Sequence, residues 1–319
     1  NVAIGHNAGL AITTGLQNTF IGGLAGDALT SSSFNTAVGY SALSSETTGA
    51  RCTALGHEAL SSQNSGSNVT VHNTALGFQA GRLITTGINN TLVGSEAGDA
   101  LTTGSSNHFI GFGAGGGVVG GSSTQGNHNI GMGFNSLVDS VVLTTGSHNI
   151  AIGNFTRTNA ADSTFATAIG YNVSGTSGYF TIGKNAEDIR AAHGNVTWQT
   201  VSDERYKKDI VDSTAGLSFI NALQPRTFKY KNLGELPEAF NAYEADSTEV
   251  FKSSQTQHGF IAQEVKAAID ADSNIKDGFK LWDSRDDGSQ EIGEAALIPI
   301  LVKAIQELSA QNAALTARI

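Results

Sequence analysis

A short phrase, Asn-Thr-Ala-Ile-Gly with small variations, recurs through the first part of the chain and restricts its fold more than any other feature. The glycine that closes the phrase stands at Gly5, Gly22, Gly39, Gly56, Gly77, Gly94, Gly111, Gly133, Gly153, Gly170 and Gly183. Six of the ten steps between these glycines are 17 residues long. A 17-residue unit is too short for two packed helices and a turn, but it suits one coil of a β-solenoid.

Within each coil the phrase predicts a short strand whose side chains alternate between two faces. In the copy at 18–22, Thr19 and Ile21 fall on one face and Phe20 on the other. The closing glycine accepts backbone angles that a Cβ forbids, and the stacked asparagines can form a hydrogen-bond ladder along the axis. One coil cannot bury its own apolar face, so the stack supplies the stability.

Three steps are longer, at 21, 22 and 20 residues, and they place insertions at Ser61–Val71, at Gly115–Gly121 and around Asp139–Leu143. Insertions in a solenoid become surface loops, and such loops often carry recognition. These loops are candidate ligand contacts, and simple length variation is the alternative. No individual ligand-binding residue is assigned. The repeat resembles the β-roll heads of trimeric autotransporter adhesins and repeats of phage tail fibres, although its 17-residue step is longer than the usual autotransporter coil.

The composition changes near residue 200 and predicts two modules. Only 14 of the first 200 residues are charged, against 32 of the last 119, and 33 of the 39 glycines lie in the first part. The net charge of −10 argues against a nucleic-acid or anionic-membrane partner. A single cysteine, Cys52, excludes an internal disulfide and a cysteine-built metal site, and no apolar run is long enough to span a membrane. We expect no metal and no cofactor, and we expect the chain to be a segment of a longer protein.

Four motifs of the second module occur together. They are the stretch from Trp198 to Ile210 around Ser-Asp-Glu-Arg, then Leu223–Tyr230, His258–Val265 and Leu297–Leu308. In this order they resemble the intramolecular chaperone domain of phage tail spikes, tail fibres and endosialidases. The resemblance implies a trimerising chaperone that releases itself as a serine–lysine autoprotease.

That resemblance places the catalytic pair at Ser202 and Lys207 and the cleavage site between Val201 and Ser202. A serine hydroxyl becomes a good nucleophile when a base takes its proton, and a lysine acts as that base when burial or nearby cations lower its pKa. Lys208 is a rival base. Spacing alone favours the interpretation of Ser202 as a turn or N-cap serine, and only the agreement of the other three motifs favours the catalytic role. A catalytic role for Glu264, in the third motif, is a weaker alternative.

The last segment predicts a coiled-coil helix over 296–319. Its apolar seam steps by three and four residues through Ile298, Leu301, Ile305, Leu308, Asn312, Leu315 and Ile319. Isoleucine and leucine placed in this way favour two strands, whereas the family resemblance implies three. We therefore expect a homotrimer, with the number of strands open on the seam alone.

The sequence thus predicts a parallel β-solenoid or β-roll over 1–183, a neck over 184–201 that ends at the cleavage site, and an α+β chaperone domain over 202–319. The expected function is that of a fibre or adhesin segment that binds a surface receptor such as a glycan, in a virion tail fibre or on a bacterial surface. Two alternatives are a tail-spike depolymerase whose catalytic domain lies upstream, and a cell-anchored bacterial surface protein. The close acidic pair Glu96 and Asp99 is weak support for glycoside hydrolysis, and the scattered histidines fit turns or ladders better than metal ligands.

Overall fold

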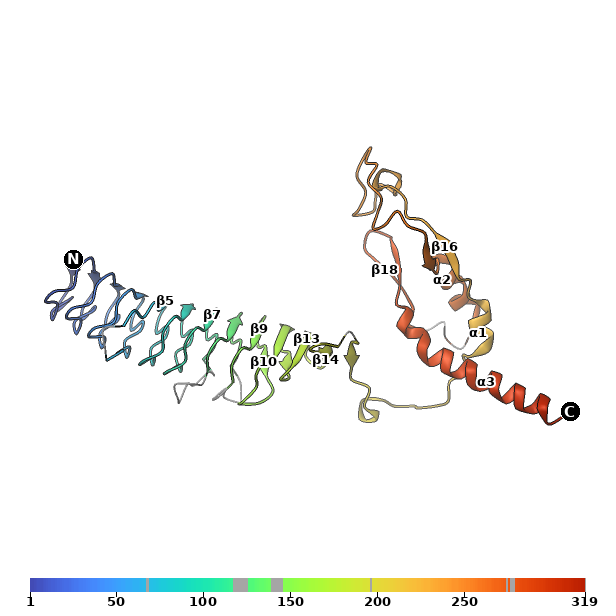
Figure 1. Cartoon of the computed structure of the whole chain (residues 1–319), viewed down its shortest axis with the longest axis horizontal. Coiled ribbons are helices and arrows are strands. Elements are labelled where there is room, and N and C mark those ends of the chain that lie inside the picture. The colour runs from blue at the N-terminus through green and yellow to red at the C-terminus, as the bar shows by residue number, and fades with distance from the viewer. Residues whose placement is uncertain are drawn as a thin grey trace. The chain divides into compact units, whose positions relative to one another are not determined.

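The computed structural model describes residues 1–66, 69–116, 126–138, 146–195, 197–273, 275 and 279–318. The chain forms two compact units, Asn1–Tyr206 and Lys207–Ile319 (Figure 1). The first unit is a β-solenoid and the second is a small unit of short strands and helices. The predicted solenoid is therefore confirmed. The insertion at Asp139–Leu143 and most of the one at Gly115–Gly121 lie outside the described residues.

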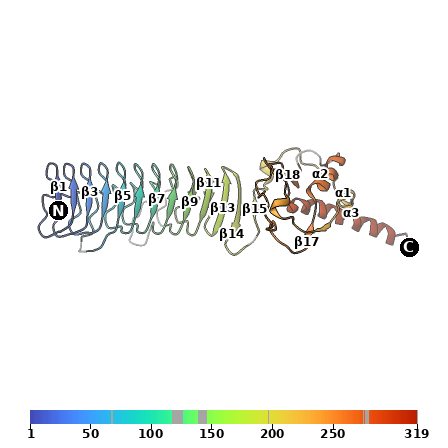
Figure 2. The ribbon, with the colours of Figure 1, turned by 90° about the horizontal axis from the view of Figure 1, so that it is seen from above.

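Each coil of the solenoid contributes one short strand to a 13-stranded sheet. The sheet runs through β1 (Val2–Ile4), β2 (Thr19–Ile21), β3 (Thr36–Val38), β4 (Thr53–Leu55), β5 (Thr74–Leu76), β6 (Thr91–Val93), β7 (His108–Ile110), β8 (Ile130–Met132), β9 (Ile150–Ile152), β11 (Thr167–Tyr171), β13 (Tyr179–Lys184), β14 (Glu187–Ala192) and β15 (Gln199–Thr200). Successive strands up to β13 pair in parallel, so chain order and spatial order coincide (Figure 2). Two further short strands, β10 (Arg157–Thr158) and β12 (Ser174–Gly175), pair beside the main sheet.

The closing glycine of the phrase is required by the close approach of neighbouring coils. Ten of its copies, from Gly5 to Gly170, have φ between +117° and +143°, which L side chains rarely adopt. A Cβ on Gly77 would also lie 2.3 Å from the carbonyl oxygen of Gly94 in the next coil. Backbone angle and stacking distance therefore both require glycine at this corner.

The asparagine before each strand forms the predicted ladder. In the middle coils, the backbone N–H of Asn107 donates to Oδ1 of Asn90 at 2.9 Å, and Nδ2 of Asn90 donates to the Gly104 carbonyl at 3.0 Å. Both asparagines are fully buried. Each ladder side chain thus satisfies one backbone donor of the following coil and one carbonyl of the turn, which is what buried polar groups need.

Cys52 replaces the ladder asparagine in one coil, and the neighbouring insertion compensates. The Cys52 thiol is buried, and burial raises its pKa to about 12. Gln63 of the insertion is fully buried, and its Oε1 accepts the side-chain N–H of Asn73 at 2.6 Å. The carboxylate of buried Glu46 accepts the backbone N–H of Ser65 at 3.1 Å. Part of the candidate ligand loop at Ser61–Val71 is therefore anchored in the core.

The solenoid core is filled by large and small side chains that complement each other between walls. The ring of Phe20 leaves room only for glycine opposite, since a Cβ on Gly9 or Gly26 would lie 2.6 Å from the ring. The next coil has Ala37 at the strand position, and the opposite site holds Leu43. This complementarity gives the close packing expected of protein interiors.

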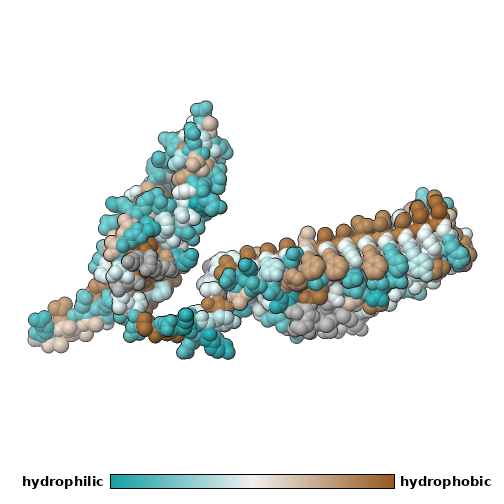
Figure 3. All heavy atoms as spheres, turned by 180° about the vertical axis from the view of Figure 1, so that it is seen from behind, coloured by the Kyte–Doolittle hydropathy of each residue, from teal (hydrophilic) through white to brown (hydrophobic). Residues whose placement is uncertain are grey.

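The outer surface of the solenoid also repeats, and ring side chains stack between coils. His57 lies between Tyr40 and Phe78, with ring centroids 5.4 and 5.3 Å apart, and His128 stacks on His148 at 4.8 Å. Hydrophobic side chains also follow one another along the length of the solenoid (Figure 3).

The second unit has its own core. It contains α1 (Leu217–Ala222), β16 (Arg226–Phe228), β17 (Gln257–Gly259), α2 (Ala262–Ala271), β18 (Trp282–Ser284), β19 (Gln290–Ile292) and α3 (Ile298–Thr316), with short 3₁₀ turns η2 (Leu233–Glu235) and η3 (Glu294–Leu297). Phe219 of α1, Val265 of α2 and Ile300 of α3 are buried together in this core. The terminal helix predicted over 296–319 is confirmed, although α3 begins two residues later and ends at Thr316.

Candidate functional site

The segment before the predicted cleavage site forms the end of the solenoid sheet. The parallel stack stops at β13, and β14 and β15 then pair antiparallel, with Ile189 opposite Thr200. The hydroxyl of Thr200 also donates to the Asp188 carbonyl at 3.2 Å. Backbone pairing therefore fixes the chain up to the residue before Val201.

An open hollow of about 770 Å³ lies beside this last strand. Ile182, Ile189 and Val201 line it together with Tyr206. Val201 and Tyr206 keep 48% and 72% of their surface exposed. The predicted scissile bond after Val201 thus borders an apolar surface depression that lies within the first unit.

Ser202 is exposed and stands just before a single 3₁₀ turn, η1 (Glu204–Tyr206). The side chain that organises this turn is Asp203, whose carboxylate accepts the Arg205 backbone N–H at 2.8 Å and the Arg205 guanidinium at 2.7 Å. Asp203 therefore caps this turn, whereas the alternative interpretation of the sequence placed the N-cap at Ser202. Arg205 is a cation close to Lys207 in sequence, but Asp203 compensates its charge.

Lys207 and Lys208 are both exposed in the single chain. The boundary between the compact units falls between Tyr206 and Lys207, so Ser202 belongs to the first unit and Lys207 to the second. A lysine needs desolvation or uncompensated neighbouring charge to become a base near neutral pH. The single chain gives Lys207 little burial, and the pairing of Ser202 with Lys207 stays a prediction.

Glu264 has a structural partner. Its two carboxylate oxygens accept hydrogen bonds from Arg226 of β16 at 2.8 and 3.0 Å. This hydrogen bonding lowers the pKa of Glu264, so the group is held ionised as the partner of a guanidinium. The pair links β16 to α2. Glu264 therefore has a structural role here, whereas the weaker alternative from the sequence was a catalytic role.

In the acidic pair of the solenoid, Glu96 and Asp99, the pKa of Asp99 is raised and not lowered. Asp99 is half-buried, and desolvation together with the nearby charge of Glu96 raises the pKa of its carboxyl. Among the described residues, no group of three His, Cys, Asp or Glu side chains lies close enough to hold a metal ion.

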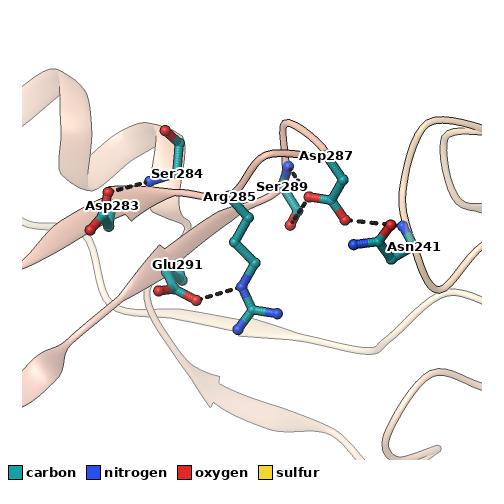
Figure 4. Close-up of polar contacts among 7 residues, drawn as sticks. All are labelled: Asn241, Asp283, Ser284, Arg285, Asp287, Ser289 and Glu291. Atoms are coloured by element: carbon teal, nitrogen blue, oxygen red, sulfur yellow. Dashed lines mark hydrogen bonds and ion pairs between the residues drawn. The ribbon is translucent and has the colours of Figure 1, made fainter. Parts of the chain in front are cut away.

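A second polar site, which sequence reasoning missed, fixes the hairpin of β18 and β19 (Figure 4). The Asp287 carboxylate accepts the backbone N–H of Asn241 at 3.0 Å and of Ser289 at 2.9 Å. The Ser289 hydroxyl donates to it at 2.6 Å. These donors lower the pKa of Asp287 to about 2. Asp287 therefore ties the hairpin tip to a loop more than 40 residues earlier in the chain.

Helix α3 has one face buried in its unit and another exposed. Ile300 and Ala304 are buried, and Glu307 accepts the Leu217 backbone N–H of α1 at 2.8 Å. The predicted seam lies on another face, where Ile298, Ile305 and Leu315 are 61%, 65% and 59% exposed. The seam is therefore uncovered in the single chain.

Comparison with known proteins gives one family match, which begins at the end of the first unit and covers part of the second. Residues 202–273 match the family Peptidase_S74, described as the chaperone of endosialidase. This family implies a self-cleaving peptidase and is associated with phage tails. No curated protein and no solved structure matches the chain. Among the described residues, no helix is long and apolar enough to cross a membrane. A β-solenoid followed by an endosialidase-type chaperone domain fits a tail-fibre-type protein with a C-terminal chaperone.

Proposed function

We propose that the chain is a segment of a trimeric fibre or adhesin whose C-terminal unit aligns three copies and then cuts itself off between Val201 and Ser202. The observation that carries the proposal is the family match that begins at Ser202, directly after the last strand of the solenoid sheet. Parallel solenoid contacts are non-local and form slowly. A removable chaperone would set the register of the chains and leave a kinetically trapped fibre.

The cleavage chemistry follows from the place of the serine after the scissile bond. The Ser202 hydroxyl attacks the carbonyl carbon of Val201 while Lys207 takes its proton. The C–N bond then breaks, the Ser202 nitrogen receives the proton, and an ester joins Val201 to the Ser202 oxygen. Water hydrolyses this ester, which frees the Val201 carboxylate and restores the hydroxyl. Burial of Lys207 between copies would supply the desolvation that the single chain lacks.

The test is the intact mass of freshly expressed chain, at 32.9 kDa before cleavage. The parent is expected to split at Val201/Ser202, while Ser202→Ala and Lys207→Ala stay whole and Lys208→Ala splits normally. Ser213→Ala is the matched serine control and is also expected to split. Hydroxylamine, which attacks esters, is expected to accelerate the parent's cleavage. A parent chain that stays whole refutes the proposal.

Trimerisation is proposed to run through the exposed seam of α3. Native mass spectrometry of the uncleavable Ser202→Ala chain is expected to give three copies, and Ile305→Gln to reduce the trimer. A dimer in place of a trimer would favour the two-stranded coiled coil that the isoleucine and leucine positions of the seam favour on their own.

The proposed location is a virion tail fibre or a bacterial surface, and the proposed ligand is a surface receptor such as a glycan. Support comes from the family's association with phage tails and from exposed loop residues such as Asn64 and Thr70. Binding of the chain to an array of surface glycans tests it, and an array without any signal contradicts the glycan.

A further inference from the structure

A row of aliphatic side chains runs in register along the outer face of the solenoid sheet. Every strand of the sheet from β1 to β14 contributes one member, and each member pairs with the next. The aliphatic row consists of Ile4, Ile21, Val38, Leu55, Leu76, Val93, Ile110, Met132, Ile152, Ile169, Ile182 and Ile189. Nine of these side chains are 37–58% exposed. None of the twelve positions carries a charge.

The aliphatic row is as large as the largest apolar patches that monomers leave uncovered. At roughly 50 Å² for each two-fifths-exposed aliphatic side chain, the nine members with about that exposure leave on the order of 450 Å² uncovered, and the three less exposed members add to this area. That value lies in the upper part of the range of about 300–600 Å² for the largest apolar patch on a monomer. Threonines such as Thr36 and Thr53 flank the row on the same strands, and with them it approaches the roughly 800 Å² that each partner buries in a stable interface.

The spacing of the aliphatic row selects its partner. Twelve rungs about 4.8 Å apart form a straight ridge about 50 Å long. A helix advances by about 1.5 Å per residue, so its side chains would meet only a few rungs, and a short ligand would cover only part of the ridge. A second copy of this chain, laid parallel, repeats the same spacing along the whole length.

The aliphatic row ends at the predicted cleavage site. Its last two members, Ile182 and Ile189, line the same hollow as Val201 and Tyr206. A copy packed along the row would therefore reach this hollow and remove Val201 from water.

We propose that the aliphatic row is the seam along which copies of this chain pack in parallel, and that closure of its last rungs around Val201 enables cleavage. The second part rests on the proposed self-cleavage. Packing along the seam would desolvate the bond after Val201 only once the solenoids are aligned. Release of the chaperone would thus follow completed assembly of the solenoid.

Two variants of the same size test the seam and its link to cleavage. Leu76→Gln/Ile110→Gln alters the row several coils away from Val201, and Leu10→Gln/Leu83→Gln alters exposed leucines outside the row. The first variant is expected to cleave at least tenfold more slowly than the parent in a time course of intact mass. The second is expected to cleave at the parent's rate. Equal cleavage rates for all three chains would overturn the coupling.

A disulfide experiment tests the seam without relying on cleavage. In the Ser202→Ala chain, Ile110→Cys is expected to form disulfide-linked pairs under mild oxidation, whereas Leu83→Cys is not. Native Cys52 is fully buried and serves as the internal background. Failure of Ile110→Cys to cross-link, or equal cross-linking of both variants, overturns the seam. An Ile110→Cys chain that retains Ser202, forms the disulfide-linked pair and never cleaves would refute the proposed self-cleavage alone.

Discussion

Asn90→Ala tests whether the asparagine ladder holds the coils together. Oδ1 of Asn90 accepts the backbone N–H of Asn107 at 2.9 Å, and its Nδ2 donates to the Gly104 carbonyl at 3.0 Å. Alanine would deprive both backbone groups of these partners inside a fully buried site. At about 1–3 kcal/mol for each buried group left without a partner, the expected loss is about 3 kcal/mol, which corresponds to roughly 150-fold in an equilibrium constant.

The assay is amide hydrogen exchange of the uncleavable Ser202→Ala chain, followed by mass spectrometry of the peptide 105–111. Exchange of buried amides reports the free energy of local opening, so the peptide is expected to exchange about 100-fold faster in Asn90→Ala. The matched control is Asn89→Gly, next in sequence, exposed and at a φ of +60° that glycine accepts. An acceleration below about fivefold, or an equal one in the control, would refute the view that the ladder carries this stability.

Two further outcomes are expected. Phe20→Ala should lower the free energy of unfolding by about 3–5 kcal/mol, because it opens a cavity in the core. Adding Gly26→Leu should restore part of this loss, because Leu43 and Leu60 occupy the equivalent site in other coils at a similar positive φ. Denaturant titration measures both, and a double variant no more stable than Phe20→Ala contradicts the expectation. The pKa of Asp287 is lowered, so its ionised form contributes stability above about pH 4 that is lost as the pH falls towards 2. The amide NMR signal of Asn241 should then shift with a midpoint near pH 2, and an unchanged titration in Asp287→Asn would contradict the assignment.

Sequence periodicity predicted the features of the solenoid that repeat. The glycine step predicted the coil, the alternation of Thr19, Phe20 and Ile21 predicted the two faces of the strand, and the recurring asparagine predicted the ladder. Each of these depends on a contact between residues one coil apart, so one local pattern repeated many times contains the information. The terminal helix was predicted for the same reason, from its seam of three- and four-residue steps.

Features that occur once were not predictable in this way. The replacement of a ladder asparagine by Cys52 was visible in sequence, but its compensation by Gln63 and Glu46 depends on how an insertion folds back. Asp287 and Asn241 meet through a long-range contact that no spacing indicates. At the candidate site, the family resemblance indicated Ser202, whereas the pairing of Asp203 with Arg205 is a local choice between several neighbouring charges.

The core shows why a repeat can vary in sequence and keep its shape. The closing glycine is followed by Ala-Gly in some coils and by Ala-Leu in others, as at Ala25-Gly26 and Ala42-Leu43, and from the sequence this looks like drift. In the structure glycine faces a large strand residue, as Gly26 faces Phe20 and Gly115 faces Phe109, while leucine accompanies alanine at the strand position. The constant quantity is the volume enclosed by a coil and its neighbours, so substitutions at the two positions are coupled. Each coil can then change its interior without altering the spacing of the outer rows, and that spacing is what a neighbouring copy would have to match.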